Sequence, residues 1–140
     1  MNGLRAASVM AVDDDALVLT SLVAVLQSFG LEVLAASSGT AALAIARDRL
    51  PDVIVSDFNM PGMSGLELIA SMRTAGVAAP AIIVSGTQRN GDLNVLKQES
   101  ERLGIVATLM KPFVPRELRA AIDSAMHGGK IPGLDARRAR

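Results

Sequence analysis

Short apolar runs and longer amphipathic segments alternate along the chain, and the alternation repeats five times. Each apolar run has about the length of a buried β-strand, whereas the longer segments repeat apolar residues at the spacing of an α-helix. The pattern therefore predicts five strands, each followed by a helix. The predicted strands are Ser8 to Val12, Leu31 to Ala35, Asp52 to Ser56, Ala81 to Ser85, and Ile105 to Met110.

The helix boundaries are marked by residues that commonly begin or end helices. Gly30 ends the first helical segment, and the second begins near Ser38. Ser64, followed three residues later by Glu67, has the pattern of a capping box, and Pro115 is suited to the first turn of the last helix. The residues predicted to face the core are Val18, Leu22, Val25, Leu26, Phe29, Leu66, Ile69, Met72, Leu93, Leu96, Leu103, Leu118, Ile122 and Met126.

Strands that are apolar throughout and separated by helices indicate a parallel sheet with helices on both faces. We therefore expect an α/β fold, a (βα)5 doubly wound parallel sheet. Our hypothesis for its strand order is the flavodoxin-like order 2-1-3-4-5. A single domain is predicted over residues 6–127. Residues 128–140 contain glycines, a proline and several basic residues, so we expect a flexible tail or the start of a linker there.

Composition narrows the function classes. The chain has 140 residues, 14 basic and 14 acidic side chains, and only three aromatic residues, which argues against direct binding to nucleic acid. The absence of cysteine excludes disulfides and thiolate zinc sites. Neither a leader-like start nor a run of apolar residues long enough for a membrane span is found, so we expect no membrane contact and a cytoplasmic location.

Polar residues with distinct chemistry follow the predicted strands. Asp13 and Asp14 come after the first strand, Asp57 after the third, Ser85 ends the fourth, and Lys111 follows the fifth. In an open α/β sheet, ligands bind beyond the carboxyl ends of the strands, near the point where the strand order reverses. If the expected strand order holds, these side chains converge on one cleft.

The carboxylates in that cleft need a positive partner. Two carboxylates ~4 Å apart repel by about 4 kcal/mol at an effective dielectric constant near 20. Mg²⁺ suits such hard oxygen ligands, Lys111 can pair with a carboxylate or a phosphate, and Ser85 can donate its hydroxyl. A carboxylate nucleophile, a cation, a lysine and a hydroxyl form a sufficient set for phosphoryl transfer.

Several local motifs agree with this chemistry: VDDD after the first strand, DVIVSDFNMPGMSGLEL around Asp57, SG after the fourth strand, and KPF after the fifth. With these motifs, the chain from about Ser8 to His127 resembles the receiver domains of two-component response regulators. The resemblance implies that Asp57 is the phosphoacceptor and that Lys111 and Ser85 assist the transfer.

The resemblance also implies a set of Mg²⁺ ligands and a partner. The metal would be held by Asp14, Asp57 and the backbone carbonyl of Asn59, with Asp13 acting through water. The bond between Lys111 and Pro112 would be cis. A histidine kinase or histidine phosphotransfer protein would supply the phosphoryl group, and an effector domain or protein would read the change; a homodimer is left open.

Two positions depart from the family pattern. Thr108 stands where many receivers have Tyr or Phe, which places the usual aromatic part of the switch in doubt. Gly86 stands where Ala is common.

Plainer interpretations and rival functions remain beside this hypothesis. Asp13 and Asp14 could be a solvated acidic turn, and Asp15 is expected to cap the first helix rather than bind a ligand. An aspartate-nucleophile phosphatase would need a second aspartate two residues after Asp57, where this chain has Asn59, so we expect a signalling protein and not an enzyme. The alternative is a phosphorylation-independent interaction or dimerisation module with the same fold; the intact polar set speaks against it.

Overall fold

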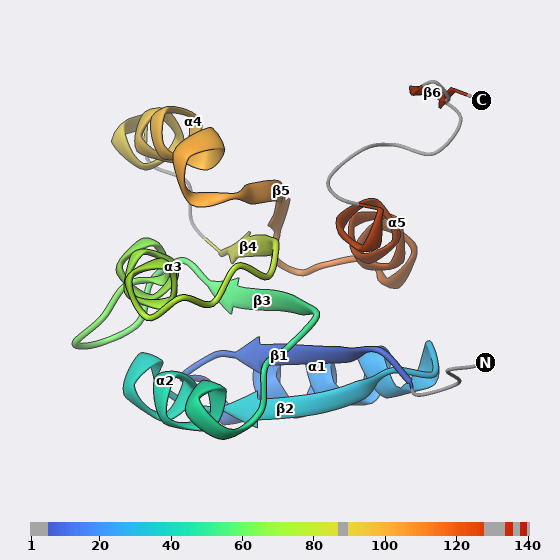
Figure 1. Ribbon diagram of the computed structural model, residues 1–140, viewed down its shortest axis with the longest axis horizontal. Coiled ribbons are helices and arrows are strands. Elements are labelled where there is room, and N and C mark those ends of the chain that lie inside the picture. The colour runs from blue at the N-terminus through green and yellow to red at the C-terminus, as the bar shows by residue number, and fades with distance from the viewer. Residues whose placement is uncertain (1–5, 87–89, 128–133, 136–137, 140) are drawn as a thin grey trace.

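The apolar runs form one parallel sheet of five strands in the order β2-β1-β3-β4-β5, so the predicted fold class and strand order are confirmed. The computed structural model describes residues 6–86, 90–127, 134–135 and 138–139 (Figure 1). The elements of the main fold are β1 (Ser8–Val12), α1 (Ala16–Ser28), β2 (Glu32–Ala36), α2 (Gly39–Asp48), β3 (Val53–Asp57), α3 (Gly65–Thr74), β4 (Ala81–Ser85), α4 (Asn90–Leu103), β5 (Ile105–Met110) and α5 (Pro115–Met126).

The strand boundaries agree closely with those predicted. β1, β4 and β5 have the expected bounds, whereas β2 and β3 each begin and end one residue later than predicted. Asp52 lies directly before β3, and its carboxylate accepts a hydrogen bond from the Ser8 backbone N–H at 2.8 Å. Asp57 is the last residue of β3.

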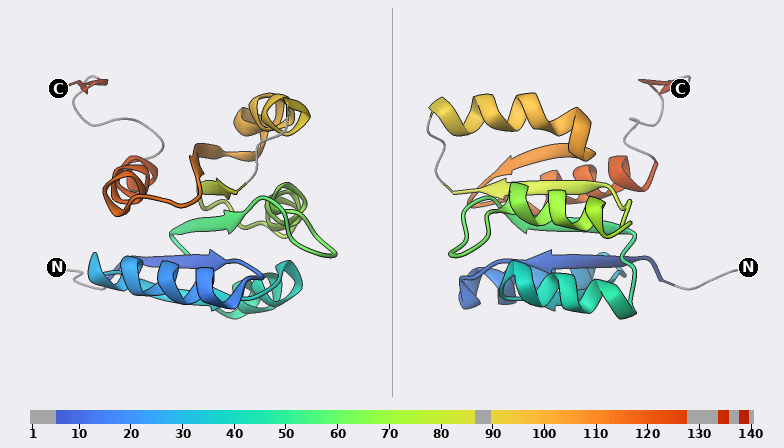
Figure 2. Two further views of the ribbon diagram at one scale, coloured as in Figure 1. Left: turned by 180° about the vertical axis from the view of Figure 1, so that it is seen from behind. Right: turned by 60° about the vertical axis from the view of Figure 1, so that its left-hand side comes forward.

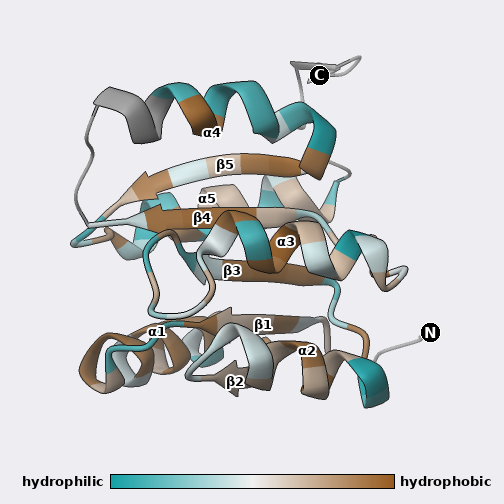
Figure 3. Cartoon of the chain, turned by 90° about the vertical axis from the view of Figure 1, so that its left-hand side faces the viewer, coloured by the Kyte–Doolittle hydropathy of each residue, from teal (hydrophilic) through white to brown (hydrophobic). Residues whose placement is uncertain are grey.

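Helices cover both faces of the sheet, and alternate residues of each strand face opposite layers. Met10 and Ile54 belong to the core beneath α2, α3 and α4, whereas Val9 and Val55 belong to the core beneath α1 and α5. The separation of α5 from α2, α3 and α4 is visible in Figures 1 and 2. In Figure 3 the strands are largely hydrophobic, while α4 presents a mostly hydrophilic surface.

The helix termini follow the local sequence signals. The Asp15 side chain accepts hydrogen bonds from the backbone N–H groups of Leu17 and Val18, so it caps α1 as predicted. The capping box formed by Ser64 and Glu67 is present at the start of α3. These caps satisfy amide groups that the first turn of a helix leaves without helical partners.

Eight of the predicted core positions are confirmed as buried, whereas Val18, Val25, Phe29 and Met126 are only partly buried. Leu22, Leu26, Ile69, Met72, Leu96, Leu103, Leu118 and Ile122 are buried. In α3 the fully buried leucine is Leu68, while Leu66 is only partly buried and packs against the core from its edge. The side chain of Leu93 lies outside the described residues.

The expected tail at 128–140 falls mostly outside the described residues and stays a prediction. Two short strands are described there, β6 (Leu134–Asp135) and β7 (Arg138–Ala139), which pair in an antiparallel manner. Within the described part of the chain, no helix is both long and apolar enough to cross a membrane.

Candidate functional site

The carboxyl ends of four neighbouring strands bring the predicted polar residues together. β1, β3, β4 and β5 are adjacent in the sheet, and Asp57 pairs in register with Val84 while Ser85 pairs with Met110. Asp13 follows β1 directly, and Lys111 follows β5. The shared direction of parallel strands therefore places these side chains at one edge of the sheet.

Three carboxylates crowd this edge. Asp13, Asp14 and Asp57 each offer an oxygen atom that lies within 4.8 Å of the others. Asp13 is 2% exposed and Asp57 is 6% exposed, whereas Asp14 is exposed to solvent. The backbone N–H of Asp15 donates to Asp13 Oδ1 at 2.9 Å and fixes the orientation of that carboxylate.

Lys111 lies between the two buried carboxylates. Its Nζ atom is 2.9 Å from Asp13 Oδ2 and 2.9 Å from Asp57 Oδ1. Its backbone N–H donates to the Ser85 carbonyl at 2.9 Å, and the Lys111–Pro112 peptide bond is cis, as expected. The extended lysine therefore bridges β5 to the ends of β1 and β3.

Burial and charge shift the ionisation of both partners. Burial raises the pKa of the Asp57 carboxyl above its ordinary value; Asp13 and Asp14 act in the same direction, and the hydrogen bond from Lys111 opposes them. Burial alone would lower the pKa of the Lys111 ammonium, but its bonds to Asp13 and Asp57 outweigh that effect and raise it. A carboxylate that is costly to ionise beside other acids is a common feature of functional sites.

The donor set fits a small divalent cation. Three carboxylates face the single positive charge of Lys111, so a net negative charge remains at the edge of the sheet. Carboxylate oxygens, with one member of the group open to solvent, suit a hard cation that keeps part of its water shell. Asp14 supplies the solvent-facing oxygen, and Asp13 and Asp57 supply the buried ones.

The remaining predicted residues surround this cluster. Ser85 is buried at the end of β4, and Asn59 is exposed in the loop after β3. A Cβ atom added to Gly86 would lie 3.4 Å from the Lys111 Cδ atom, an ordinary contact, so an alanine would fit there. Thr108 is exposed on β5.

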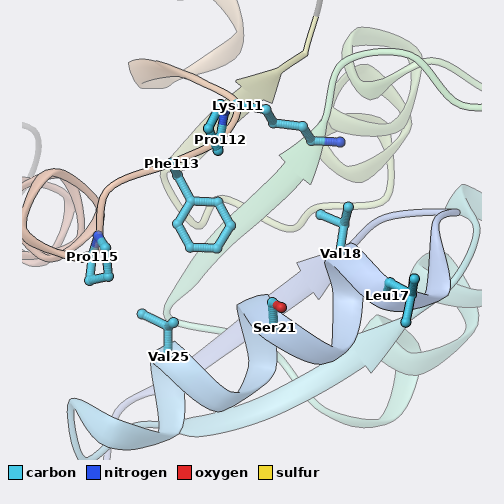
Figure 4. Close-up of a pocket in the computed structure, with 8 residues that line it drawn as sticks. All are labelled: Leu17, Val18, Ser21, Val25, Lys111, Pro112, Phe113 and Pro115. Atoms are coloured by element: carbon cyan, nitrogen blue, oxygen red, sulfur yellow. The ribbon is translucent and has the colours of Figure 1, made fainter.

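A groove beside Lys111 was not predicted from the sequence. It has a volume of about 590 Å³ and lies between α1 and the segment that joins β5 to α5. Figure 4 shows Phe113 and Pro115 facing the α1 side chains across this space, with Lys111 at one end. The lining residues are Leu17, Val18, Ser21, Val25, Lys111, Pro112, Phe113 and Pro115. The Leu17 side chain is 81% exposed, which the helical spacing of apolar residues did not predict.

Comparison with known proteins agrees with the geometry. Residues 9–123 match the response regulator receiver domain family. The chain belongs to this family. The family match and the observed strand order support each other.

The most similar proteins include regulators longer than this chain. The transcriptional regulatory protein PrrA of Mycobacterium tuberculosis is 33% identical over 124 residues, which cover 89% of this chain and 52% of PrrA. The DNA-binding response regulator MtrA of the same species is 33% identical over 114 residues, covering 81% of this chain and 48% of MtrA. The receiver domain thus spans about half the length of the curated relatives that it matches.

Solved structures of similar proteins have the same fold. A response regulator receiver domain protein from Clostridium thermocellum superposes with a TM-score of 0.78 at 29% identity, covering 87% of this chain and 95% of that one. The Vibrio cholerae chemotaxis protein CheY4 superposes with a TM-score of 0.77 at 32% identity, covering 86% of this chain and 99% of that one. These two receivers are nearly complete matches in length.

Proposed function

We propose that this receiver domain accepts a phosphoryl group on Asp57 and signals through the change in charge and conformation that follows. The observation that carries the proposal is the bridge by Lys111, whose Nζ atom lies 2.9 Å from both Asp13 and Asp57. This contact places a fixed positive charge beside a buried nucleophile. Phosphoryl transfer depends on such positioning and charge neutralisation more than on covalent help from the protein.

The proposed metal is Mg²⁺, held by Asp14, Asp57 and the backbone carbonyl of Asn59, with Asp13 contributing through water. Support comes from the close approach of the three carboxylates and from the position of Asn59 in the loop directly after β3. When bound, Mg²⁺ would neutralise charge on the phosphoryl oxygens. Asp13 would also hold Lys111 in place through its 2.9 Å ion pair.

The reaction is an in-line exchange at phosphorus. A carboxylate oxygen of Asp57 forms a bond to phosphorus while the bond from phosphorus to the donor nitrogen or oxygen breaks, and the electron pair of that bond stays on the donor. We propose that Lys111 then moves part of its interaction from the carboxylate to a phosphoryl oxygen, and that Ser85 donates its hydroxyl to another. The acyl phosphate is hydrolysed when water attacks phosphorus, which releases inorganic phosphate and restores the Asp57 carboxylate.

The domain is therefore a signalling protein that assists its own phosphorylation and dephosphorylation. Its donor is proposed to be a histidine kinase or a histidine phosphotransfer protein, and its reader an effector domain or protein. PrrA is named as a transcriptional regulatory protein and MtrA as a DNA-binding response regulator, which makes a DNA-binding effector one candidate. Because a histidine kinase takes its phosphoryl group from ATP, we also propose a cytoplasmic location.

The groove beside Lys111 is the proposed contact for the donor protein. A phosphohistidine must approach Asp57 closely, and Lys111 both lines the groove and contacts Asp57. Leu17 offers an exposed apolar surface at this position on α1. An apolar helical face of the donor, packed against α1, would bring its histidine toward the carboxylate.

The phosphorylation-independent alternative is not favoured. A vestigial site would have no reason to keep the Lys111 bridge, the buried carboxylates and the acidic turn together. Burying charge is costly unless it is paired, and this site keeps both the charges and their pairing.

The proposal is tested by intact mass after incubation with acetyl phosphate. We expect one phosphoryl group to be added to the wild-type chain in the presence of Mg²⁺, and none in Asp57→Asn or after EDTA treatment. Addition of equal extent to Asp57→Asn would contradict the role of Asp57. The absence of any adduct in the wild type, together with no binding of beryllofluoride, would favour the phosphorylation-independent module.

A further inference from the structure

Ser56 is a buried polar side chain directly before the phosphoacceptor. It is fully buried, and its partners in register on the neighbouring strands are Val12 and Ile83. Both belong to the apolar core beneath α2, α3 and α4. A hydroxyl in such a layer is costly unless it is hydrogen-bonded.

The Ser56 hydroxyl finds its partner on the backbone of the next residue. Ser56 Oγ donates a hydrogen bond to the Asp57 carbonyl oxygen at 3.0 Å. The bond therefore acts on the peptide group between Asp57 and Phe58. That peptide is where β3 ends and where the loop carrying Asn59 begins.

Two other elements hold this peptide group and the next one. The Phe58 N–H donates to the Val84 carbonyl of β4 at 2.9 Å, and the Gly65 N–H donates to the Phe58 carbonyl at 2.8 Å. Gly65, the first residue of α3, packs so closely that an added Cβ atom would lie 2.3 Å from the Asp57 carbonyl oxygen. Ser56 and β4 thus hold the peptide between Asp57 and Phe58 through hydrogen bonds. The start of α3 packs against its carbonyl oxygen and holds the next peptide through a hydrogen bond.

We propose that Ser56 is a positioning residue for phosphoryl transfer to Asp57. The dihedral angle ψ of Asp57 sets the direction of its carbonyl and also the path of the following loop relative to its own side chain. A hydrogen bond that fixes the carbonyl therefore fixes how the carboxylate and the loop carbonyl of Asn59 face each other. This inference rests on the proposed function, because it assigns Ser56 to the same reaction.

The test compares two variants of nearly equal shape. Ser56→Thr keeps the hydroxyl, whereas Ser56→Val replaces it with a methyl group, so any cost of the additional methyl is shared by both. We expect Ser56→Val to react with acetyl phosphate roughly tenfold more slowly than Ser56→Thr at saturating Mg²⁺, since small errors in placement are costly in such reactions. Ser56→Thr should stay close to the wild-type rate.

A second measurement examines the peptide itself and does not depend on phosphorylation. Amide hydrogen exchange should be faster at Phe58 and Gly65 in Ser56→Val than in Ser56→Thr, with exchange at Ile54 unchanged. A purely structural role would lower the melting temperature of the valine variant and leave the rate of the folded protein equal to that of the threonine variant. If the valine variant does not fold, Ser56→Ala takes its place in both measurements.

The outcomes separate the two claims. Equal rates and equal exchange in the threonine and valine variants, with a wild type that is phosphorylated, would overturn the positioning role of Ser56 alone. A wild type that takes no phosphoryl group would overturn the proposed function, and with it the catalytic part of this inference. Slower transfer and faster exchange in the valine variant, restored in the threonine variant, would establish it.

Discussion

At the residue scale, the site depends on how two buried carboxylates share one lysine. Asp13 and Asp57 both contact Lys111 Nζ, and both are nearly inaccessible to solvent. The ionised form of Asp57 is disfavoured by burial and by its acidic neighbours, so its carboxyl has a raised pKa. In the metal-free site, repulsion between the carboxylates is therefore unfavourable, and a bound cation or the loss of one negative charge would reduce it.

Removing the charge of Asp57 should stabilise the metal-free fold. A carboxyl with a raised pKa in the folded chain adds stability below its ordinary pKa, and that stability is lost as the pH rises through the folded value. In EDTA at neutral pH, we expect Asp57→Asn to unfold at a higher urea concentration than the wild type. The difference should close as the pH falls through the folded pKa of Asp57.

The control for this measurement is Asp48→Asn, which alters an exposed carboxylate at the last position of α2. Its urea midpoint should stay close to that of the wild type. A wild type more stable than Asp57→Asn across this range would contradict the assigned direction of the shift.

Removal of Lys111 should have the opposite effect. Lys111→Met leaves Asp13 and Asp57 without their cation. We expect the free energy of unfolding to fall by about 1 to 2 kcal/mol. This is less than for a fully buried ion pair, because the Lys111 side chain is partly exposed. Mg²⁺ should restore more stability to this variant than to the wild type. Lys97→Met, at an exposed position on α4, serves as the control; an equal Mg²⁺ effect in all three proteins would show that Lys111 is not coupled to the metal site.

At the element scale, the loop between β3 and α3 depends on close backbone packing. The first residue of α3 is glycine because an added Cβ atom would overlap the Asp57 carbonyl oxygen. By contrast, Gly86 after β4 has room for a Cβ atom in ordinary contact with Lys111. Of these two glycines, only Gly65 therefore has a steric reason to lack a side chain.

These two glycines give a matched pair of variants. We expect Gly65→Ala to lower the free energy of unfolding by about 2 to 3 kcal/mol. The added Cβ atom would clash with the backbone at Asp57, which cannot move away as a flexible side chain could. Gly86→Ala should change stability by less than about 1 kcal/mol. Urea unfolding measures both, and equal costs would contradict the packing described for the start of α3.

The sequence predicts elements well where one physical signal dominates. The apolar runs of β1, β4 and β5 and the caps at Asp15 and Ser64 are local signals, and the structure agrees with them. In α3, residues 66 and 68 are both leucine, and local spacing does not decide which of them faces the core. The neighbouring helices and strands decide in favour of Leu68.

The site is only partly predictable for the same reason. Asp13, Asp14, Asp57, Ser85 and Lys111 can be found because parallel strands present their carboxyl ends at one edge. From the sequence, Ser56 is an ordinary strand residue, because its proposed role depends on a hydrogen bond to a backbone atom that the sequence does not predict. The groove joins α1 to residues nearly one hundred positions later, so only the folded chain brings its walls together.

At the scale of the whole molecule, the acidic cluster and the proposed docking groove lie at different places around the sheet. The acidic cluster lies at the strand ends, while the groove lies on the side of the sheet covered by α1 and α5. Lys111 belongs to both, because it lines the groove and contacts Asp57. A donor protein docked on this side would therefore meet the phosphoacceptor from one direction.

This arrangement predicts that a change in the groove slows phosphorylation by a protein donor but not by a small-molecule donor. With a histidine kinase that phosphorylates the wild-type chain, Leu17→Glu should slow transfer by roughly tenfold, because one exposed apolar contact of an interface is lost. Its reaction with acetyl phosphate should be unchanged. Leu50→Glu, which alters another exposed leucine outside the groove, is the control; equal slowing by both variants would exclude the groove as the docking site.

The most direct test of the central claim is to locate the phosphoryl group on the chain. After reaction with acetyl phosphate and Mg²⁺, borohydride reduces an acyl phosphate to an alcohol and releases phosphate, which marks the modified carboxyl permanently. Peptide mass spectrometry should find homoserine at position 57 and at no other acidic residue. Homoserine at Asp13 or Asp14 with Asp57 unmodified would contradict the assignment of Asp57 as the phosphoacceptor.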